Sequence, residues 1–198
     1  MEKTKIYIYG ASGHGKVIAD VARSAGFNEI IFLDDGGELK FSPDLPKCPV
    51  IIAIGDNKIR ANLQKKVESA GFEVISLVHK TAVISPSAKI GKGTVIMPNA
   101  LVNADAIIGD GVILNSACVI EHDCKIGKFA HISPNSALAG GVEVGEFTHI
   151  GIGSSIIQKI KIGKNSIIGA GSVVINEIDE NCVAVGVPAK IIKRNLKI

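Results

Sequence analysis

Residues 84–113 read ISPSAK IGKGTV IMPNAL VNADAI IGDGVI, and this six-residue repeat continues to residue 174. An aliphatic residue opens each of sixteen hexads, without an insertion or a slip. These positions are Ile84, Ile90, Ile96, Val102, Ile108, Leu114, Ile120, Ile126, Ile132, Leu138, Val144, Ile150, Ile156, Ile162, Ile168 and Val174. A mostly small residue follows four positions later, as at Ala88 and Ala100, and a glycine often comes directly after the aliphatic residue, as at Gly91 and Gly109.

A period of six fits neither the 3.6-residue helix nor a simple alternating strand. It predicts a solenoid in which each hexad forms a short strand and a turn, and three hexads form one triangular coil. We expect the aliphatic residue to fill the axis, the small residue to fit the corner, and glycine to supply turn conformations that other residues avoid. Sixteen hexads predict about five coils. A sandwich of alternating strands would not keep one phase from residue 84 to residue 174.

The first 80 residues lack this repeat and alternate predicted strands with predicted helices. The expected strands are Lys5–Tyr9, Glu29–Leu33, Val50–Ile54 and Phe72–Leu77, and the expected helices are Lys16–Ala25 and residues 57–70. Such alternation is typical of a small parallel α/β sheet. The fold class is therefore mainly β, with a Rossmann-like domain over residues 1–80 and a parallel β-helix with a charged tail over residues 81–198.

A glycine-rich segment, Gly10-Ala11-Ser12-Gly13-His14-Gly15, links the first predicted strand to the first predicted helix. Its glycines would let a phosphate approach the free N–H groups of the helix N-terminus. Asp34 and Asp35 end the second predicted strand, where an acid usually meets a ribose hydroxyl. The spacing is GxxGxG rather than GxGxxG, and the domain is short. We therefore expect a mononucleotide or a nucleotide sugar rather than NAD.

The glycine-rich segment also contains a partial phosphate-loop signature and a histidine. Gly10 to Lys16 also spells GxxxxGK, but Val17 stands where a phosphate-loop NTPase carries the Ser or Thr that holds Mg²⁺. NTPase activity is therefore disfavoured. His14 has two interpretations, as a turn residue in an unusual backbone or as a contact to the phosphate or sugar of a substrate.

Composition narrows the remaining classes of function. Aromatic residues make up 4% of a chain that is 46% hydrophobic, which suits a narrow, regular strand-rich interior. The net charge of +3 is not gathered in runs outside Lys190–Lys197, which argues against nucleic-acid binding. The four cysteines lack CxxC spacing and predict reduced thiols without a metal. No apolar run approaches 18 residues, so we expect a cytoplasmic protein without a membrane span.

The predicted coils carry three histidines. Because one coil is eighteen residues long, their spacing predicts which of them lie on the same edge. His131 and His149 are eighteen residues apart and should stack on adjacent coils. His122 stands between Glu121 and Asp123, where an acidic neighbour would raise its basicity and suit a general base. The alternative is a solvated acidic turn. Gly140 lies one coil beyond His122, leaves room for a reacting group and could offer its N–H to an oxyanion.

Five segments together carry a resemblance to a known family: YGASGHG (9–15), FLDD (32–35), IAIGDN (52–57), VIEHDCKIG (119–127) and GVPAK (186–190). Over essentially its whole length the chain resembles the hexapeptide-repeat nucleotide-sugar N-acetyltransferases, especially those that act on UDP-4-amino sugars of the bacillosamine type. The resemblance implies a left-handed β-helix and acetyl-CoA as co-substrate without a metal. It also implies a homotrimer whose active sites lie between neighbouring prisms.

The resemblance also implies roles for individual residues. His122 would be the catalytic base, Asp123 would orient it where relatives often have Glu, and Gly140 would donate to the acetyl carbonyl. The acetyl-CoA contacts would be His131, Ile152, Gly153, Ala170, Gly171, Pro188 and Lys190. The UDP-sugar contacts would be Ser12, Gly13, His14, Asp34, Asp35 and Gly55. His79 and His149 receive no role.

The function implied is transfer of acetyl to the 4-amino group of a UDP-4-amino-4,6-dideoxy sugar, a glycan precursor. Two alternatives share the architecture: a GDP-amino-sugar N-acetyltransferase and a sialic acid O-acetyltransferase. A third is a non-catalytic scaffold that binds a nucleotide sugar. A nucleotidyltransferase is disfavoured because the N-terminal domain is too short.

Overall fold

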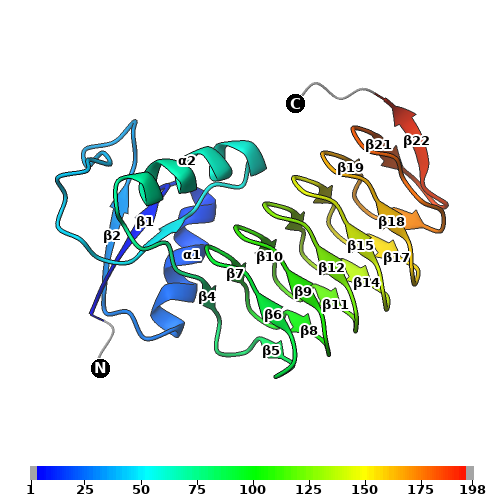
Figure 1. Cartoon of the computed structure of the whole chain (residues 1–198), viewed down its shortest axis with the longest axis horizontal. Coiled ribbons are helices and arrows are strands. Elements are labelled where there is room, and N and C mark those ends of the chain that lie inside the picture. Colours follow the sequence, from blue (N-terminus) through cyan, green and yellow to red (C-terminus); the bar gives the residue numbers. More distant parts are fainter. Residues whose placement is uncertain (1–3, 195–198) are drawn as a thin grey trace.

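The computed structural model describes residues 4–194, and most of its length is a three-sided solenoid (Figure 1). Three sheets of short parallel strands form its sides. Face one contains β4 (Leu77–Val78), β7 (Val95–Ile96), β10 (Ile113–Leu114), β13 (His131–Ile132), β16 (His149–Ile150), β19 (Ile167–Ile168) and β21 (Val183–Val185), closed by the antiparallel β22 (Lys190–Lys193). Face two contains β5 (Val83–Ile84), β8 (Leu101–Val102), β11 (Val119–Ile120), β14 (Ala137–Leu138), β17 (Ser155–Ile156) and β20 (Val173–Val174). Face three contains β6 (Lys89–Ile90), β9 (Ile107–Ile108), β12 (Lys125–Ile126), β15 (Glu143–Val144) and β18 (Lys161–Ile162).

The first residue of each hexad fills the axis, as the repeat predicts. Ile96, Leu114 and Ile132 are fully buried, and they stack on face one at steps of eighteen residues. The fifth residue of the hexad is also buried: Ala100, Cys118 and Ala130 have no exposed surface. Burying an aliphatic side chain stabilises a fold by about 1.5–3 kcal/mol, so one continuous column of such residues is the main source of stability.

Glycine has two separate roles at the corners, one of which the sequence analysis assigned wrongly. The fourth residue of most hexads adopts a left-handed backbone, including Asp123 (φ 60°) and Gly153 (φ 67°). The glycine directly after the aliphatic residue has no such φ. At Gly127, a Cβ would lie 2.5 Å from the backbone nitrogen of Glu146 in the next coil. These glycines are therefore needed because the coils stack closely, not because their backbone is unusual.

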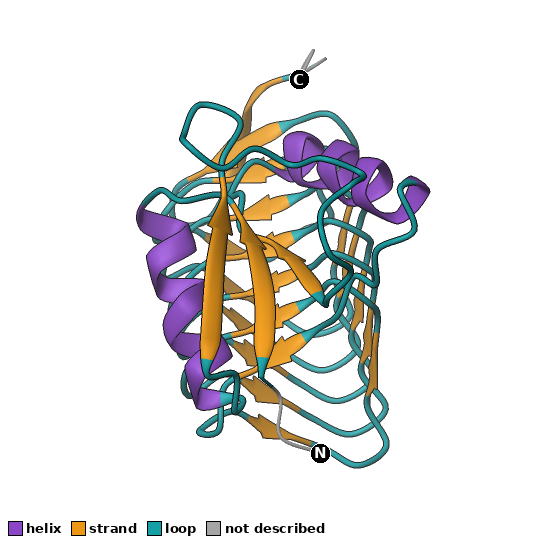
Figure 2. Ribbon diagram, turned by 90° about the vertical axis from the view of Figure 1, so that its left-hand side faces the viewer, coloured by secondary structure: helices purple, strands orange, loops and turns teal. Residues whose placement is uncertain are grey.

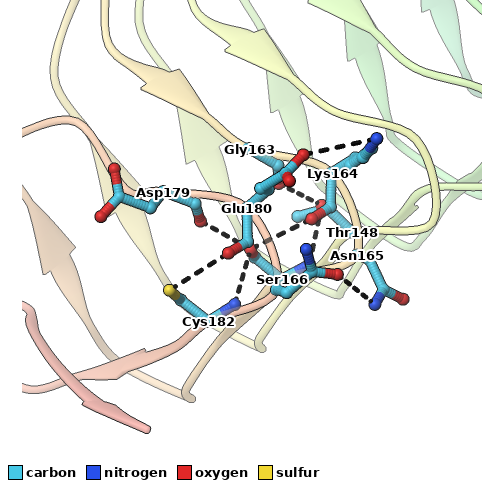
Figure 3. Close-up of polar contacts among 9 residues, drawn as sticks. Thr148, Gly163, Lys164, Asn165, Ser166, Asp179, Glu180 and Cys182 are labelled. Atoms are coloured by element: carbon cyan, nitrogen blue, oxygen red, sulfur yellow. Dashed lines mark hydrogen bonds and ion pairs between the residues drawn. The ribbon is translucent and has the colours of Figure 1, made fainter. Parts of the chain in front are cut away.

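Buried hydroxyl groups add hydrogen bonds between coils at some of the corners (Figure 3). Thr148 Oγ1 donates to the carbonyl of Gly163 at 2.7 Å and accepts from the backbone N–H of Ser166. Ser166 Oγ repeats the pattern one coil further, donating to Asp179 and accepting from Cys182. Each hydroxyl satisfies one donor and one acceptor that the corner would otherwise bury unpaired.

The solenoid is longer than the predicted five coils because both ends depart from the simple pattern. At the N-terminal end, β4 adds a strand to face one before the first hexad that we counted. At the C-terminal end the step shortens to sixteen residues, since Ile162 pairs with Ile178 and Ile168 with Ala184. A sixfold search misses this last coil because two residues are absent from its repeat.

The N-terminal part of the chain is a three-stranded parallel sheet with a helix on each side. The strands β1 (Lys5–Tyr9), β2 (Glu29–Leu33) and β3 (Val50–Ile52) lie in the order β2-β1-β3. The helices are α1 (Gly13–Ser24) and α2 (Asn57–Ser69). The expected strand Phe72–Leu77 is wrong: its Val74 makes one isolated bridge to Val50 before the chain enters the solenoid at β4. The expected first helix begins earlier, at Gly13, so that His14 lies in its first turn.

This part packs against face one of the solenoid (Figure 2). Ile18 and Val21 of α1 share a buried cluster with Val95, Met97 and Ile113 of the solenoid. The predicted domain boundary at residue 80 stays a prediction. The outer ends of the two predicted domains, residues 1–3 and 195–198, lie outside the described residues. The end of the charged tail is among them. Neither helix in residues 4–194 has the length and apolar character needed to cross a membrane.

Arg60 of α2 links the N-terminal part to the solenoid by hydrogen bonds. Its side chain is 1% exposed and donates to the carbonyls of Gly111 at 2.7 Å and Phe129 at 2.8 Å, on two successive coils. It also donates to the carbonyls of Ile54 and Gly55 in the loop before α2. Burial lowers the pKa of Arg60 to about 10, which still leaves it charged at neutral pH.

We predict that Gly127→Ala lowers the free energy of unfolding by about 1–3 kcal/mol, the range for overpacking a tight site. The added methyl group would meet the backbone of Glu146 in the next coil. The matched control is Gly153→Asn, since Gly153 already has the left-handed backbone that Asn135 and Asn165 adopt at the same hexad position. Denaturant unfolding should separate the two, and equal stabilities would contradict this account of the corner.

Candidate active site

His122 lies at the corner between β11 and β12, where face two meets face three. Its side chain is 62% exposed, and Nδ1 lies 2.8 Å from Oδ2 of Asp123. With Nδ1–H donating to the carboxylate, Nε2 carries the free lone pair. The hydrogen bond to Asp123, with the negative charges of Asp123 and Glu121, raises the pKa of His122 above its ordinary value. The arrangement is that of an oriented imidazole base.

The two acids beside His122 have different partners. Asp123 holds the imidazole from a corner position with left-handed backbone, which fixes the direction of its short side chain. Glu121 instead accepts a hydrogen bond at 2.9 Å from Nδ2 of Asn103 on the neighbouring coil. Its carboxylate also receives the backbone N–H of His122 at 3.3 Å. Among residues 4–194, Asp123 is therefore the acid that orients the ring.

Gly140 lies directly beside the His122 ring, as the eighteen-residue step predicts. A Cβ on Gly140 would lie 2.6 Å from Nε2 of His122, so any larger residue would displace the imidazole. The next residue, Gly141, donates its N–H to the His122 carbonyl at 2.9 Å. In the part of the chain that the structure describes, no hydrogen bond uses the N–H of Gly140. That donor is free for an oxyanion near Nε2.

Most of the predicted acetyl-CoA contacts form a separate column at another corner. Ile152 and Gly153 stack below Ala170 and Gly171, with Gly171 N–H donating to the Ile152 carbonyl at 2.8 Å. Pro188 follows a cis peptide beyond them, and β22 starts at Lys190. This column lies where face one meets face two. Within one chain, face two therefore separates it from His122, Asp123 and Gly140.

Three of the six predicted nucleotide contacts, Ser12, Asp34 and Asp35, line a cavity of about 250 Å³ at the N-terminus of α1, whereas Gly13 and His14 lie outside its lining. Ser12 is the N-cap residue but makes no side-chain cap, and Gly13 has open space around it, so the first N–H groups of α1 are accessible. Asp34 and Asp35 line the same cavity. Gly55 does not: it borders a smaller cavity of about 110 Å³ together with His149.

His14 and His131 lie together inside the contact between the N-terminal part and the solenoid. Their ring centres are 6.5 Å apart, and the His149 ring lies 4.7 Å from that of His131. Burial, with the nearby charge of Arg60, lowers the pKa of His14 to about 4. Burial and the neighbouring His149 lower the pKa of His131 to about 3. Both rings are neutral at neutral pH, which favours packing over charge-based phosphate binding for His14.

The structure leaves His131 on face one, apart from the column of Ile152 and Ala170. Its Nε2 lies 3.1 Å from Nδ2 of Asn115, while Ser133 Oγ lies 2.9 Å from Nε2 of His149. The predicted stacking of these two histidines on adjacent coils is confirmed by their pairing in β13 and β16. Residues 4–194 contain no cluster of three His, Cys, Asp or Glu side chains that could hold a metal ion.

Sequence analysis missed three residues near the nucleotide cavity and the interface: Tyr9, Arg60 and Lys66. Tyr9 was quoted as the end of a strand and the start of the YGASGHG segment but given no role, although it lines the cavity beside Asp35. Lys66 follows Leu63 and Ile59 at the three- and seven-residue spacing of one helix face. That spacing was a usable signal for Lys66. No comparable signal marked Arg60, because in the sequence a buried arginine that binds carbonyl groups cannot be told from a surface arginine of a helix.

Two family models match the chain in the order of its two parts. The PglD N-terminal domain matches residues 5–67. The bacterial transferase hexapeptide model, of six repeats, matches residues 87–122, 105–140 and 141–176. This match confirms the predicted left-handed β-helix. A curated relative, UDP-N-acetylbacillosamine N-acetyltransferase of Bacillus subtilis, is 39% identical over 109 residues, and the match spans 46% of this chain and 50% of that protein.

Two solved structures are similar over nearly the whole chain. PerB from Caulobacter crescentus, in complex with CoA and GDP-perosamine, is 36% identical with a TM-score of 0.91, covering 95% of this chain and 97% of that one. The acetyltransferase domain of PglB from Neisseria gonorrhoeae, in complex with acetyl coenzyme A, is 36% identical with a TM-score of 0.88, covering 95% and 98%. The chain thus belongs to the hexapeptide-repeat nucleotide-sugar N-acetyltransferases.

Proposed function

We propose that this protein transfers the acetyl group of acetyl-CoA to the amine of a nucleotide-linked amino sugar, with His122 as general base. The observation that carries the proposal is the trio of His122, Asp123 and Gly140. An oriented imidazole with a free Nε2 lies against a glycine whose N–H has no partner among the described residues. A non-catalytic scaffold would not need this packing of Gly140 on the ring.

The chemistry follows from these positions. As the sugar amine attacks the thioester carbonyl, Nε2 of His122 accepts a proton from the nitrogen, and the C–N bond forms. The negative charge that develops on the carbonyl oxygen is met by the Gly140 N–H. When the C–S bond breaks, the imidazolium of His122 returns the proton to the leaving thiolate. Asp123 stabilises the imidazolium throughout, because its carboxylate remains 2.8 Å from Nδ1.

We further propose that the active site is completed by a second copy of the chain. The column of Ile152 and Ala170 and the corner of His122 lie on opposite edges of face two, so one chain cannot present both to one acetyl-CoA. A closed ring with the same contact repeated would bring the two corners together, and three prisms close it as a trimer. Light scattering should give three times the mass of the chain, and a monomer in solution would contradict this assembly.

For the sugar nucleotide we propose a UDP-4-amino-4,6-dideoxy sugar of the bacillosamine type. It is supported by the similarity to the Bacillus subtilis enzyme named above. The second candidate is a GDP-linked 4-amino sugar, favoured by the similarity to PerB over nearly the whole chain. Both candidates present a sugar amine to the same His122 and differ only at the nucleotide.

We predict that His122→Ala lowers kcat by about 10²–10⁴-fold, the usual contribution of a general base. The KM values should change little, because the ring acts on the proton that is transferred in the chemical step. The measurement is thiol release from acetyl-CoA across a panel of UDP- and GDP-4-amino sugars. His79→Ala is the matched control, since His79 also lies on the solenoid and, among the described residues, its side chain bonds to Thr81 alone. Near-normal turnover of His122→Ala at saturating substrate would falsify the role of His122.

The pH dependence gives an independent test. His122 must be neutral to accept a proton, so kcat/KM should fall as the pH drops through its raised pKa. Asp123→Asn removes the main cause of that raised pKa, so the fall in kcat/KM should shift to lower pH. The control is Asp105→Asn, which changes the same corner position one coil away. Identical acid limbs for Asp123→Asn and the unmodified protein would contradict the assignment of Asp123.

A further inference from the structure

Three residues from different elements form a hydrogen-bonded group at the nucleotide cavity: Tyr9 of β1, Asp35 after β2, and Lys66 of α2. Tyr9 Oη lies 2.7 Å from both carboxylate oxygens of Asp35. Nζ of Lys66 donates to Tyr9 Oη at 3.0 Å and lies 3.5 Å from Oδ2 of Asp35. Tyr9 is 2% exposed, whereas the side chains of Asp35 and Lys66 are 53% and 47% exposed. A buried tyrosine thus supports two charged groups that a ligand can reach.

Both charged groups keep hydrogen-bonding capacity for a ligand. A carboxylate has about four acceptor positions, and the single O–H of Tyr9 cannot fill them. An ammonium has three N–H donors, of which Lys66 uses one on Tyr9 and directs at most one more to Asp35. The hydrogen bond from Tyr9 lowers the pKa of Asp35, and the hydrogen bond to Tyr9 raises the pKa of Lys66. Both are therefore charged at neutral pH, side by side.

The cavity extends from the N-terminus of α1 to Asp35 and Tyr9, and Lys66 lies just outside its lining, bonded to Tyr9. Gly10 to Ser12, before α1, form one end, and Ile54, Ile59 and Leu63 form an apolar wall suited to a flat base. Lys66 follows Leu63 on the same face of α2. Asp34 differs from Asp35: it directly follows β2 and accepts the N–H of Gly36 at 2.9 Å, in the place where a Rossmann-type acid meets a ribose. Asp35 is thus left for the base.

We propose that Asp35 and Lys66 act as an acceptor–donor pair that reads the edge of the nucleotide base, with Tyr9 as the positioning residue. The inference rests on the proposed function, since it assumes that a nucleotide sugar occupies the cavity. The edge that fits is a ring N–H beside a carbonyl, which uracil and guanine share. Cytosine and adenine present a ring nitrogen acceptor beside an amino group. Their ring nitrogen, an acceptor, would face the acceptor Asp35, and their amino group, a donor, would face the donor Lys66. The pair would therefore exclude them by repulsion.

UDP and CDP test the pair directly because they differ only at this edge. Calorimetric titration should show UDP binding about tenfold more tightly than CDP, the effect of one net hydrogen bond to a charged group. Lys66→Met should reduce that preference to about twofold or less, whereas Lys66→Arg, which keeps a cationic donor, should retain it. Asp35→Asn should weaken the preference for UDP, since its amide N–H can donate to the cytosine ring nitrogen while Lys66 still repels the cytosine amino group.

Two further variants separate recognition from structure. Lys65→Met is the matched control: Lys65 is adjacent on α2 but borders a different cavity, with Gln64 and Glu68. Its ratio of UDP to CDP affinity should be unchanged. Tyr9→Phe should lower the ratio and raise KM for the sugar nucleotide with little change in kcat. A merely structural role for Tyr9 would lower the unfolding midpoint and leave the ratio intact.

The outcomes distinguish this inference from the proposed function. If neither UDP, GDP nor CDP binds, the proposed nucleotide-sugar substrate fails. If UDP and CDP bind equally, the base-reading pair is wrong while the acetyltransferase proposal stands. A third arm uses 2′-deoxy-UDP. If Asp35→Asn abolishes discrimination against the deoxy nucleotide but not against CDP, Asp35 reads the ribose and the inference is overturned.

Discussion

Stacking of coils at a fixed register, eighteen residues apart, is the constraint on which the rest of the molecule depends. Each short strand pairs in parallel with the strands one coil above and below it, and the corners between them are joined by backbone hydrogen bonds. Such a solenoid has contacts only between neighbouring repeats, so a shift of one residue anywhere would be passed along the column. The register converts sequence spacing into position in space. It places Gly140 against His122, His149 against His131 and Ala170 against Ile152.

The same corner geometry leaves the proposed oxyanion donor, the N–H of Gly140, free without special strain. At the corner that bears His122, the carbonyl of the third residue of the hexad accepts a bond from the next coil, and the fourth residue adopts a left-handed backbone. Among the described residues, the N–H of the third residue has no backbone acceptor in this pattern. Gly140 is such a third residue, so its N–H is free because the coil was built that way. Asp123 is such a fourth residue, and its backbone holds the carboxylate beside the ring. Catalysis would then use features that most of the coils share, with His122 as the added chemistry.

Periodicity could predict most of the solenoid, because the sixfold repeat has one structural solution. It could also place Gly140 beside His122 and His131 beside His149, since both follow from eighteen-residue arithmetic. It could not predict the last coil, where a two-residue deletion hides Ile178 and Ala184 from the repeat. Nor could it predict Arg60, whose role depends on carbonyl groups of Gly111 and Phe129 far along the chain. The false strand at Phe72–Leu77 has a similar cause: its apolar residues pack on β3 but the chain leaves for the solenoid.

Neighbouring acids illustrate why residue type alone could not complete the site. Asp34 and Asp35 are adjacent residues of the same type, and Glu121 and Asp123 are two carboxylates that flank the same histidine. In the fold, Asp34 bonds to a turn N–H while Asp35 is held by Tyr9 and Lys66. Glu121 turns to Asn103 while Asp123 turns to His122. In each pair the available partner decides what the carboxylate is bonded to, and in the proposals above this separates the acid that would meet a base from the one that would meet a ribose. Under the proposed function, specificity would be set by the groups that hold the acids, and those groups come from strands and helices far apart in sequence.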